Sequence, residues 1–503
     1  MTSNTESLPL TVDSRVVPAG RLLIGGQWRD AADGATEATV NPATEQVTTT
    51  VAKSGPEDAA LAAAAARQAF DDGGWSRMPG SQRAKVLNKV ADLIEERAED
   101  LAFREVVDMG KLWRDAMSID VPHIANMFRY FAGWTTKLEG AVKTVEPVGS
   151  TGDVMAFTRR QPLGVVAAIT PFNFPLILTV SKIAPALAAG NTFIHKPSAD
   201  TPLSSITLAE IMMDAGVPEG AYNLLTGGGA EVGRALVGDP RIDKVALTGS
   251  TATGKSIIRD SAETLKHLTM ELGGKSPDII FADADLERAV TTAFYAIFWN
   301  KGEVCVAGSR LLVQREVYDE VVERLTAMCA NARTGDPFDP ASDFGPIANR
   351  REFEKVLRYI DIGRDEDGAS LVTGGKSLTV DGRGLYIEPT VFANASNDMR
   401  IAQEEIFGPV LPVIPFDTED DAVALGNATP YGLAAGVQTR DLAKALRVAE
   451  RLDAGTVWLN TWHLYDPSAP FGGFKASGYG RENGPEAFEN YTQYKTTWLS
   501  LQS

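Results

Sequence analysis

The spacing of apolar residues changes along the chain and predicts two kinds of region. Over residues 54–71 and 81–100, apolar positions follow the period of an amphipathic helix, and Pro56 suits a first helical turn. From Pro162 onward, strand-length apolar runs alternate with helix-length stretches, and the runs read LGVVAAIT, NTFIHKP, YNLLTG, KVALTGS and HLTMELG. That alternation predicts parallel βα units in an open, doubly wound sheet.

The same alternation returns in the second half of the chain. Strands are predicted at SRLLVQ, VLPVIPF, LAAGVQT and GTVWLN, and an amphipathic helix at residues 441–452. In the first region, Gly190 and Gly216 stand where left-handed residues would end helices, and Thr201 followed by Pro202 suits a helix start. Two doubly wound, Rossmann-like α/β domains are therefore expected.

A hairpin is predicted apart from both domains. Residues 142–161 are rich in β-branched residues and are interrupted by the turn sequence GSTG at 149–152. Solitary exposed strands invite aggregation unless another chain covers them. We therefore expect residues 142–161 and 485–503 to form a small β oligomerisation element of a homodimer or homotetramer.

Bulk composition argues against several classes of partner. The 503 residues carry 48 Lys and Arg against 66 Asp and Glu, a net charge of -18 that repels nucleic acid and anionic lipid. The two cysteines, Cys305 and Cys329, allow no disulfide framework or tetrathiolate zinc site and favour a reducing compartment. No signal pattern opens the chain, and its most apolar run is interrupted by Pro171, Asn173 and Pro175. A cytoplasmic protein without nucleic-acid or membrane partners is expected.

One stretch has the letters of a phosphate-binding P-loop. In ALTGSTATGKSII, at residues 246–258, Gly249 is followed after four residues by Gly254, Lys255 and Ser256. A nucleotide hydrolase is therefore one alternative, in which Asp283 at the end of DIIFAD could hold the metal. That alternative leaves Cys305, Asn173 and the motif at residues 471–482 without a role.

Cys305, in NKGEVCVAGSR, has the features of a nucleophile. Glycines stand at 302 and 308 and a helical pattern ends just before it, so the backbone can approach a ligand closely. A buried cysteine is most often an inert small hydrophobe, and Cys329, inside the predicted helix 317–333, fits that description.

A thiolate that attacks a carbonyl needs an oxyanion donor, and the resulting thioester needs an activated water. Asn173 in PFNFP follows the predicted strand 163–170, at the end where open α/β sheets bind ligands, although it could simply cap a turn. Glu271 in MELGGKSP has apolar neighbours that would raise its pKa toward that of a general base, although it could equally be a surface residue.

The four histidines, His123, His195, His267 and His463, form no metal-binding motif, and no G-x-S-x-G elbow occurs. No metal site is therefore expected. The histidines are interpreted as structural, with the exception of His463, a candidate for the substrate site.

Seven motifs together resemble one family. PFNFP, HKPSADTP, LTGSTATG, MELGGKSP, GEVCVAGSR, EEIFGPV and APFGGFKASGYGRE stand in the order and approximate spacing of the NAD(P)-dependent aldehyde dehydrogenases, over nearly the whole chain. The resemblance implies a dinucleotide-binding domain of residues 1–141 and 162–271 and a catalytic domain of residues 272–484. It also implies that the GSTATG turn receives the cofactor pyrophosphate, so that Lys255 fits the P-loop pattern by coincidence.

By this resemblance, Cys305 attacks the aldehyde carbon, and the Asn173 amide and the Cys305 N–H hold the oxyanion. Hydride transfer to the nicotinamide leaves a thioester, which water activated by Glu271 hydrolyses to the carboxylic acid. Lys182 and Glu482 match family positions near the proton-exit path. A catalytically silent relative is a third alternative, which the presence of the whole catalytic set argues against.

The resemblance also implies the cofactor contacts. Lys196 is assigned to the adenosine ribose, and Glu405 and Phe407 to the nicotinamide ribose. The full set is Ile169, Thr170, Phe172, Lys196, Ser198, Ala199, Gly229, Gly233, Gly249, Ser250, Leu272, Glu405 and Phe407, with Gly249 and Ser250 at the pyrophosphate. NAD-preferring members commonly carry glutamate at the position of Ala199, where it repels a 2′-phosphate, so NAD+ is favoured only slightly and NADP+ stays open.

Two further departures from the family pattern concern the substrate site. Glu303 stands where glutamine is usual, and an acid so close to Cys305 could raise the thiol pKa or act as a base. Ser181 replaces a frequent aromatic residue and leaves more room. The predicted tunnel residues are Phe174, Ser181, Trp299, His463, Tyr465 and Phe471. Aromatic walls without an arginine clamp predict an apolar or aromatic aldehyde as the small-molecule substrate.

Overall fold

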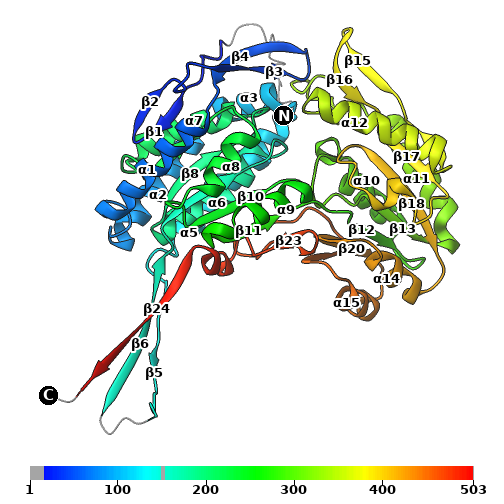
Figure 1. The fold of residues 1–503 in the computed structure, drawn as a ribbon. Coiled ribbons are helices and arrows are strands. Elements are labelled where there is room, and N and C mark those ends of the chain that lie inside the picture. Colours follow the sequence, from blue (N-terminus) through cyan, green and yellow to red (C-terminus); the bar gives the residue numbers. More distant parts are fainter. Residues whose placement is uncertain (1–15, 149–152, 502–503) are drawn as a thin grey trace, which may run out of the picture.

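Two large sheets, each covered by helices on both faces, make up most of the molecule (Figure 1). The computed structural model describes residues 16–148 and 153–501, so the start of the chain and the predicted GSTG turn at 149–152 lie outside the described residues. The first sheet has the order β2-β1-β9-β8-β7-β10-β11-β23, formed by Gln27–Arg29, Leu22–Ile24, Tyr222–Leu224, Thr192–Lys196, Val165–Ile169, Lys244–Thr248, His267–Glu271 and Gly478–Tyr479. The second has the order β14-β17-β18-β13-β12-β20-β21, formed by Ser370–Thr373, Thr390–Ala393, Val410–Phe416, Arg310–Gln314, Pro277–Ile280, Ala434–Gln438 and Thr456–Leu459.

Alternate residues of β7 enter two different cores. Val165 and Ala167 pack with α1 (Pro56–Asp72), α8 (Ala230–Gly238) and α9 (Thr251–Asp260) on one face of the first sheet. Val166 and Ala168 pack on the other face, against a layer formed by α6 (Pro175–Ala189), α7 (Leu203–Ala215), α2 (Gly80–Glu96), α3 (Ala98–Met109) and α5 (Val121–Ala132). A strand buried on both faces reads as a continuous apolar run, which is why the apolar run at 163–170 predicts a strand.

The order of the first sheet reverses between β7 and β10. The chain runs from β7 to β8 and β9 on one side, then returns to β10 and continues to β11 on the other, and these five strands are parallel. The predicted doubly wound topology is confirmed. In such sheets ligands bind beyond the carboxyl ends of the strands at the reversal, here at the segments that follow Ile169 and Thr248.

The second sheet repeats this arrangement. Ile280 of β12 lies in the core on one face of the sheet, with residues of α10 (Leu286–Phe298) and α11 (Tyr318–Asn331). Ile279 lies in the core on the other face, with residues of α14 (Glu419–Asn427) and α15 (Leu442–Arg451). The amphipathic helix predicted over 441–452 is α15, and Asp441 caps it, because its carboxylate accepts from the N–H groups of Ala443 and Lys444. The remaining longer elements are α12 (Arg350–Asp361) and the hairpins β3–β4 (Thr36–Asn41, Gln46–Ala52) and β15–β16 (Ser377–Val380, Arg383–Ile387).

Two helix boundaries differ from the sequence prediction. The single helix expected over 81–100 is two helices, because Arg97 leaves helical geometry (φ -104°, ψ 23°) and forms ion pairs with Glu210 and Asp214 of α7. Thr201 does not cap α7: the Leu203 N–H donates instead to Asp108 of α3, 2.8 Å away. Both differences arise from contacts between helices, which a local pattern does not contain. The helix ends at Gly190 (φ 96°) and Gly216 (φ 90°) are as predicted.

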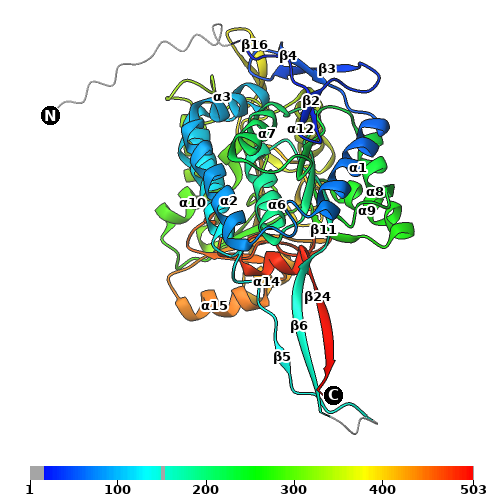
Figure 2. The same cartoon turned by 90° about the vertical axis from the view of Figure 1, so that its left-hand side faces the viewer.

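A three-stranded antiparallel sheet projects from the body, as Figures 1 and 2 show from two directions. The predicted hairpin supplies β5 (Val142–Lys143) and β6 (Val154–Pro162), and the tail of the chain supplies β24 (Thr492–Ser500). β24 pairs with β6 along its whole length. Among the described residues, no helix is long and apolar enough to cross a membrane.

Candidate active site

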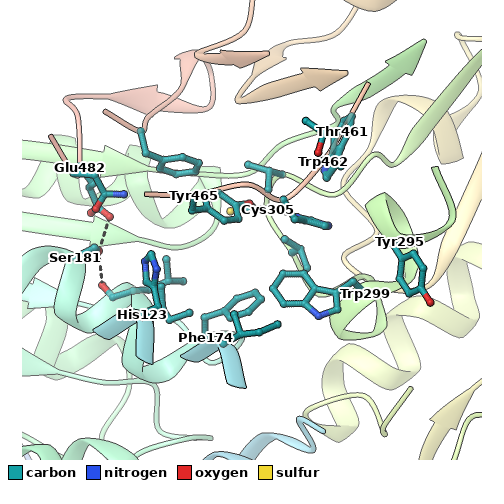
Figure 3. A pocket seen from close by; sticks show the side chains of 18 of the residues that line it. His123, Phe174, Ser181, Tyr295, Trp299, Cys305, Thr461, Trp462, Tyr465 and Glu482 are labelled. Carbon is teal, nitrogen blue, oxygen red and sulfur yellow. Dashed lines mark hydrogen bonds between the residues drawn. The ribbon is translucent and has the colours of Figure 1, made fainter. Parts of the chain in front are cut away.

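A cavity of about 440 Å³ contains Cys305 in its wall (Figure 3). All six residues predicted for the substrate tunnel line it: Phe174, Ser181, Trp299, His463, Tyr465 and Phe471. Further wall residues that sequence reasoning missed come from the segment before α5, from α5 and α10 and from the loop after β21, and include Ile119, His123, Met127, Thr291, Tyr295 and Trp462. Their helices carry the ordinary apolar pattern of core helices, so no local signal marks the residues that face the cavity.

The segment before Cys305 follows an unusual backbone path. Asn300, Lys301 and Gly302 are left-handed in succession, with φ values of 48°, 60° and 72°. A Cβ at position 302 would lie 2.3 Å from the Gly408 carbonyl oxygen, so this position requires glycine. The turn ends α10 and carries the chain across to Cys305.

Burial raises the pKa of the Cys305 thiol to about 12, and the carboxylates of Glu405 and Glu271 act in the same direction. The N–H groups of Val306 and of Cys305 itself contact the sulfur and favour its anionic form. At neutral pH the thiol is therefore protonated, and its proton has to leave when the sulfur attacks. Cys329 has a similar pKa but lies in the core of α11, as expected of an inert thiol.

Asn173 is buried and its side chain is held in one orientation. Its Nδ2 donates to the backbone carbonyl of Glu303, 2.9 Å away, and its own backbone carbonyl accepts from Asn300 Nδ2 at 3.2 Å. An amide has two N–H groups, so one remains free for a further acceptor. The long-range bond to Glu303 shows that Asn173 does more than cap its own turn.

Glu271 is the last residue of β11 and is only 3% exposed, which rules out the surface-residue alternative. Neither carboxylate oxygen has a hydrogen-bond partner among the described residues. Burial raises the pKa of Glu271 well above its usual value, and the Glu482 carboxylate raises it further, against the opposing charges of Lys182 and Arg481. The segment after it packs on the nucleophile, because a Cβ at Gly274 would lie 2.3 Å from the Cys305 carbonyl oxygen.

Lys182 and Glu482 form a buried ion pair at the edge of the cavity. Lys182 Nζ donates to Glu482 Oε1 and also to Thr248 Oγ1, 2.6 Å away at the end of β10. Ser181 Oγ donates to Glu482 Oε2 at 2.6 Å, as the dashed line in Figure 3 shows. Ser181 therefore orients Glu482 in addition to forming part of the cavity wall.

The side chain of Glu303 is engaged by partners other than the Cys305 thiol. Its carboxylate forms an ion pair with Lys301 Nζ at 3.0 Å and accepts from the Ala348 N–H at 3.1 Å. The carboxylates that raise the pKa of Cys305 are Glu405 and Glu271 instead. The turn directs this acidic side chain, two residues before the cysteine, toward its own buried partner.

The nucleotide-hydrolase alternative fails on geometry. α9 begins at Thr251, directly after Ser250, so no extended glycine loop surrounds a phosphate. Lys255 is exposed in the middle of that helix, and Asp283 accepts from Thr439 and Lys444 beside the other sheet.

The reversal of the first sheet has the features of a dinucleotide site. Ser250 caps α9 by accepting from the Thr253 N–H at 3.2 Å, and a Cβ at Gly229, the cap of α8, would meet no atom within 4 Å. Lys196 is buried and has no carboxylate ion pair among the described residues, and burial lowers its pKa to about 8. Open helix N-termini and a lysine whose ammonium donates only to the Pro197 carbonyl, at 3.2 Å among the described residues, fit a diphosphate with a ribose, so the residues present fit the expected cofactor.

The remaining predicted cofactor residues extend from this reversal toward Cys305. Ile169, Thr170, Phe172, Ser198, Ala199, Gly233, Gly249 and Leu272 belong to the strand ends and helix starts around it. Glu405 Oε1 accepts from the Gly274 N–H at 3.0 Å, and the Phe407 ring (φ 60°) meets Phe172 edge-on with centroids 5.7 Å apart. Gly274 thus joins the Glu405 end of the predicted site to the backbone of Cys305.

Glu37 is a further site residue that sequence reasoning missed. Its carboxylate accepts from the Gly228 N–H at 3.1 Å. Its negative charge favours the charged form of Lys196 and so opposes the lowering of the Lys196 pKa by burial. It lies on β3, far from every motif, so only the fold reveals it. Within the described ranges, no group of three or more His, Cys, Asp or Glu side chains is placed to hold a metal ion.

Comparisons with known proteins agree with this geometry. The model of the aldehyde dehydrogenase family matches residues 28–497. Aldehyde dehydrogenase 1 of Tanacetum cinerariifolium is 46% identical over 95% of this chain and 94% of its own length. An NAD+ complex of an aldehyde dehydrogenase from Bacillus cereus is 43% identical, with a TM-score of 0.94 over 99% of both chains.

A mutant of the indole-3-acetaldehyde dehydrogenase AldA from P. syringae, in complex with NAD+ and IAA, is 42% identical. Its TM-score is 0.93 over 96% of this chain and 97% of that one. The family match and these near full-length similarities show that the chain belongs to the aldehyde dehydrogenase family.

Proposed function

We propose that this enzyme oxidises apolar or aromatic aldehydes to carboxylic acids through a covalent intermediate on Cys305. The observation that carries the proposal is the position of Cys305 in the wall of an aromatic cavity. The buried carboxylate of Glu271 has no hydrogen-bond partner among the described residues, and its charge raises the pKa of the Cys305 thiol. Cys305 Sγ bonds to the aldehyde carbon, and the thiol proton leaves toward a carboxylate. The free N–H of Asn173 Nδ2 and the Cys305 N–H stabilise the oxyanion.

Loss of hydride from the same carbon leaves a thioester on Cys305, and the NAD(P)+ nicotinamide, when bound, supplies the hydride acceptor. Water then attacks the thioester, and Glu271 removes its proton as the carbon–sulfur bond breaks and the acid is released. Glu271 fits this step because no hydrogen bond from a described residue reaches its carboxylate and weakens its basicity. Glu482 and Lys182, which act on the charge of Glu271, pass the proton outward.

Lys196, Glu405 and the N-termini of α8 and α9 would hold the cofactor. We propose NAD+ as the preferred form, although Ala199 leaves the ribose pocket without its usual glutamate. Glu37 supports this preference, because its carboxylate lies near Lys196 and would repel a 2′-phosphate.

The cavity wall supports the substrate class. No arginine or lysine lines it among the described residues, so a carboxylate on the substrate would be buried without a partner. Burial lowers the pKa of His463 to about 4, so this wall residue is neutral and cannot serve as a cationic clamp. The similar P. syringae protein is an indole-3-acetaldehyde dehydrogenase, which supports an aromatic substrate for this chain.

An aldehyde panel with NAD+ and NADP+ tests these assignments, with reduced nicotinamide as the readout and Cys305→Ala as the blank. Benzaldehyde and indole-3-acetaldehyde should exceed succinic semialdehyde in kcat/KM by about tenfold or more. Equal values for the two classes would contradict the substrate assignment. A kcat/KM with NADP+ equal to that with NAD+ would contradict the role of Glu37.

We also propose that the first sheet with its helices is the dinucleotide-binding domain (1–141 and 162–271) and that residues 272–484 form the catalytic domain. The projecting sheet would join subunits in a dimer or tetramer, since Tyr494, Trp498 and Leu499 are exposed on β24. Sedimentation analysis of the full chain tests this, and a monomer would contradict it. Two free thiols agree with a cytoplasmic setting, which fractionation of cells that produce the protein would test.

A further inference from the structure

Lys301 and Glu303 form a buried ion pair directly before the nucleophile. Lys301 is 3% exposed and Glu303 0%, and Lys301 Nζ lies 3.0 Å from Glu303 Oε2. Lys301 Nζ also donates to the Met109 carbonyl at 3.2 Å, and Glu303 Oε1 accepts from the Ala348 N–H at 3.1 Å. The pair therefore ties the turn to the end of α3 and to the segment before α12.

The turn that the pair holds has an unfavourable left-handed backbone conformation, which the surrounding structure must stabilise. Asn300 and Lys301 are non-glycine residues with φ values of 48° and 60°. Such conformations are strained for non-glycine residues, and such strain concentrates at functional sites. The next carboxylate that acts on Lys301, Asp115, already accepts from Trp299 Nε1 at 3.0 Å. Glu303 is thus the one carboxylate ion-paired with Lys301 in the described ranges.

The backbone of Glu303 connects this pair to Asn173. Its carbonyl accepts from Asn173 Nδ2 at 2.9 Å and faces Asn300 Nδ2 at 3.4 Å. One N–H of the Asn173 amide is fixed by that carbonyl, so the direction of the other follows from the position of the carbonyl. A shift of the Glu303 backbone would turn the free N–H away from the oxyanion.

We propose that Lys301 and Glu303 are positioning residues, which hold the Glu303 carbonyl and thereby aim the Asn173 amide at the oxyanion formed on Cys305. The inference rests on the oxyanion role of Asn173 in the proposed function. Neither side chain lines the cavity, so the pair acts through Asn173 rather than on the substrate.

Single-turnover hydride transfer, measured as reduced nicotinamide formed with enzyme in excess over aldehyde, tests the pair. Glu303→Gln should slow this step about tenfold, because the amide is no longer aimed, with little change in NAD+ affinity or aldehyde KM. Asn173→Ala should slow it about 10²- to 10³-fold. In the Asn173→Ala background, Glu303→Gln should have no further effect, since there is no amide left to aim.

Lys301→Arg keeps a buried cation beside Glu303 and serves if Glu303→Gln does not fold. It should slow the same step a few-fold, and this effect should also vanish in the Asn173→Ala background. Multiplicative effects of either variant with Asn173→Ala would overturn the inference, as would an unchanged rate in both single variants. An unchanged rate in Asn173→Ala alone would overturn the oxyanion role itself, a result distinguishable from the other two.

Discussion

Two buried glutamates, Glu271 and Glu303, lie in segments that adjoin Cys305. They differ in the partners that their carboxylates have. Glu271 is 3% exposed and its carboxylate has no hydrogen-bond partner among the described residues. Glu303 is 0% exposed and its carboxylate is matched by Lys301 Nζ and the Ala348 N–H. Burial raises the pKa of both carboxyl groups, and Lys301 opposes the effect at Glu303.

The difference separates a reactive group from a supporting one. A buried carboxylate without donors is costly to ionise, so it persists where its basicity is used. A buried carboxylate that is paired with a cation and an N–H group has a structural role, because both partners hold it in place. In the proposed mechanism, proximity to the nucleophile in the sequence therefore does not identify the base: Glu303, two residues from Cys305, is the proposed support of the turn, whereas Glu271, 34 residues from Cys305, is the proposed base.

Removing the sulfur that both glutamates adjoin should have the largest effect. Cys305→Ala should lower kcat with any aldehyde by on the order of 10⁴-fold or more, since no covalent step remains. Cys329→Ala is the matched control: it should keep kcat and cost about 1 kcal/mol of unfolding free energy, measured by urea denaturation. Substantial turnover by the Cys305 variant would contradict the covalent mechanism, and with it the roles proposed for both glutamates.

Glu271→Gln should separate the two chemical steps. Steady-state turnover should fall about 10²- to 10⁴-fold, because the thioester loses its base. The first turnover should still produce a burst of reduced nicotinamide, approaching one equivalent per active site. Absence of a burst, with hydride transfer slowed as much as turnover, would place Glu271 in the earlier step.

The pH dependence of thioester hydrolysis tests whether Glu271 is the base of this step. The base acts when ionised, and burial sets the pKa of Glu271 well above the usual range of a carboxyl group. Turnover limited by hydrolysis should therefore rise about tenfold per pH unit below that pKa and level off above it. Glu271→Gln should remove the slope. A wild-type rate that is flat from pH 5 to 8 would contradict the assignment.

The smallest expected effects are on stability, and they have opposite signs. A folded-state pKa raised above the unfolded value means that the native protein holds more protons, so Glu271 lowers stability as pH rises from its usual value toward the raised one. Glu271→Gln should therefore make the protein more stable at alkaline pH. Glu303→Gln leaves Lys301 unpaired and should cost about 3 kcal/mol at neutral pH. Thermal unfolding of both variants at pH 6 and pH 9 measures this, and shifts of equal sign would remove the distinction.

Much of the fold could be predicted from local pattern. Strands such as β7 and β10, buried on both faces, read as apolar runs, and glycines at 190 and 216 end their helices as predicted. The break at Arg97 and the cap that Asp108 provides for α7 could not be predicted, because both depend on side chains from other helices. Of the candidate site, the tunnel residues were found through the resemblance, whereas His123 and Tyr295 look like ordinary residues of core helices.

The sequence by itself determined the family, the doubly wound sheets and the identity of the candidate nucleophile, amide and base, because each depends on residue type at a fixed place in a motif. Only the tertiary structure decided which carboxylates are free and which are paired. Whether a buried charge is matched depends on atoms brought from distant segments: Ala348 and Lys301 meet the Glu303 carboxylate, whereas no hydrogen-bond donor among the described residues reaches the Glu271 carboxylate. A pattern along the chain does not contain that information, because desolvation and pairing are properties of three-dimensional neighbours.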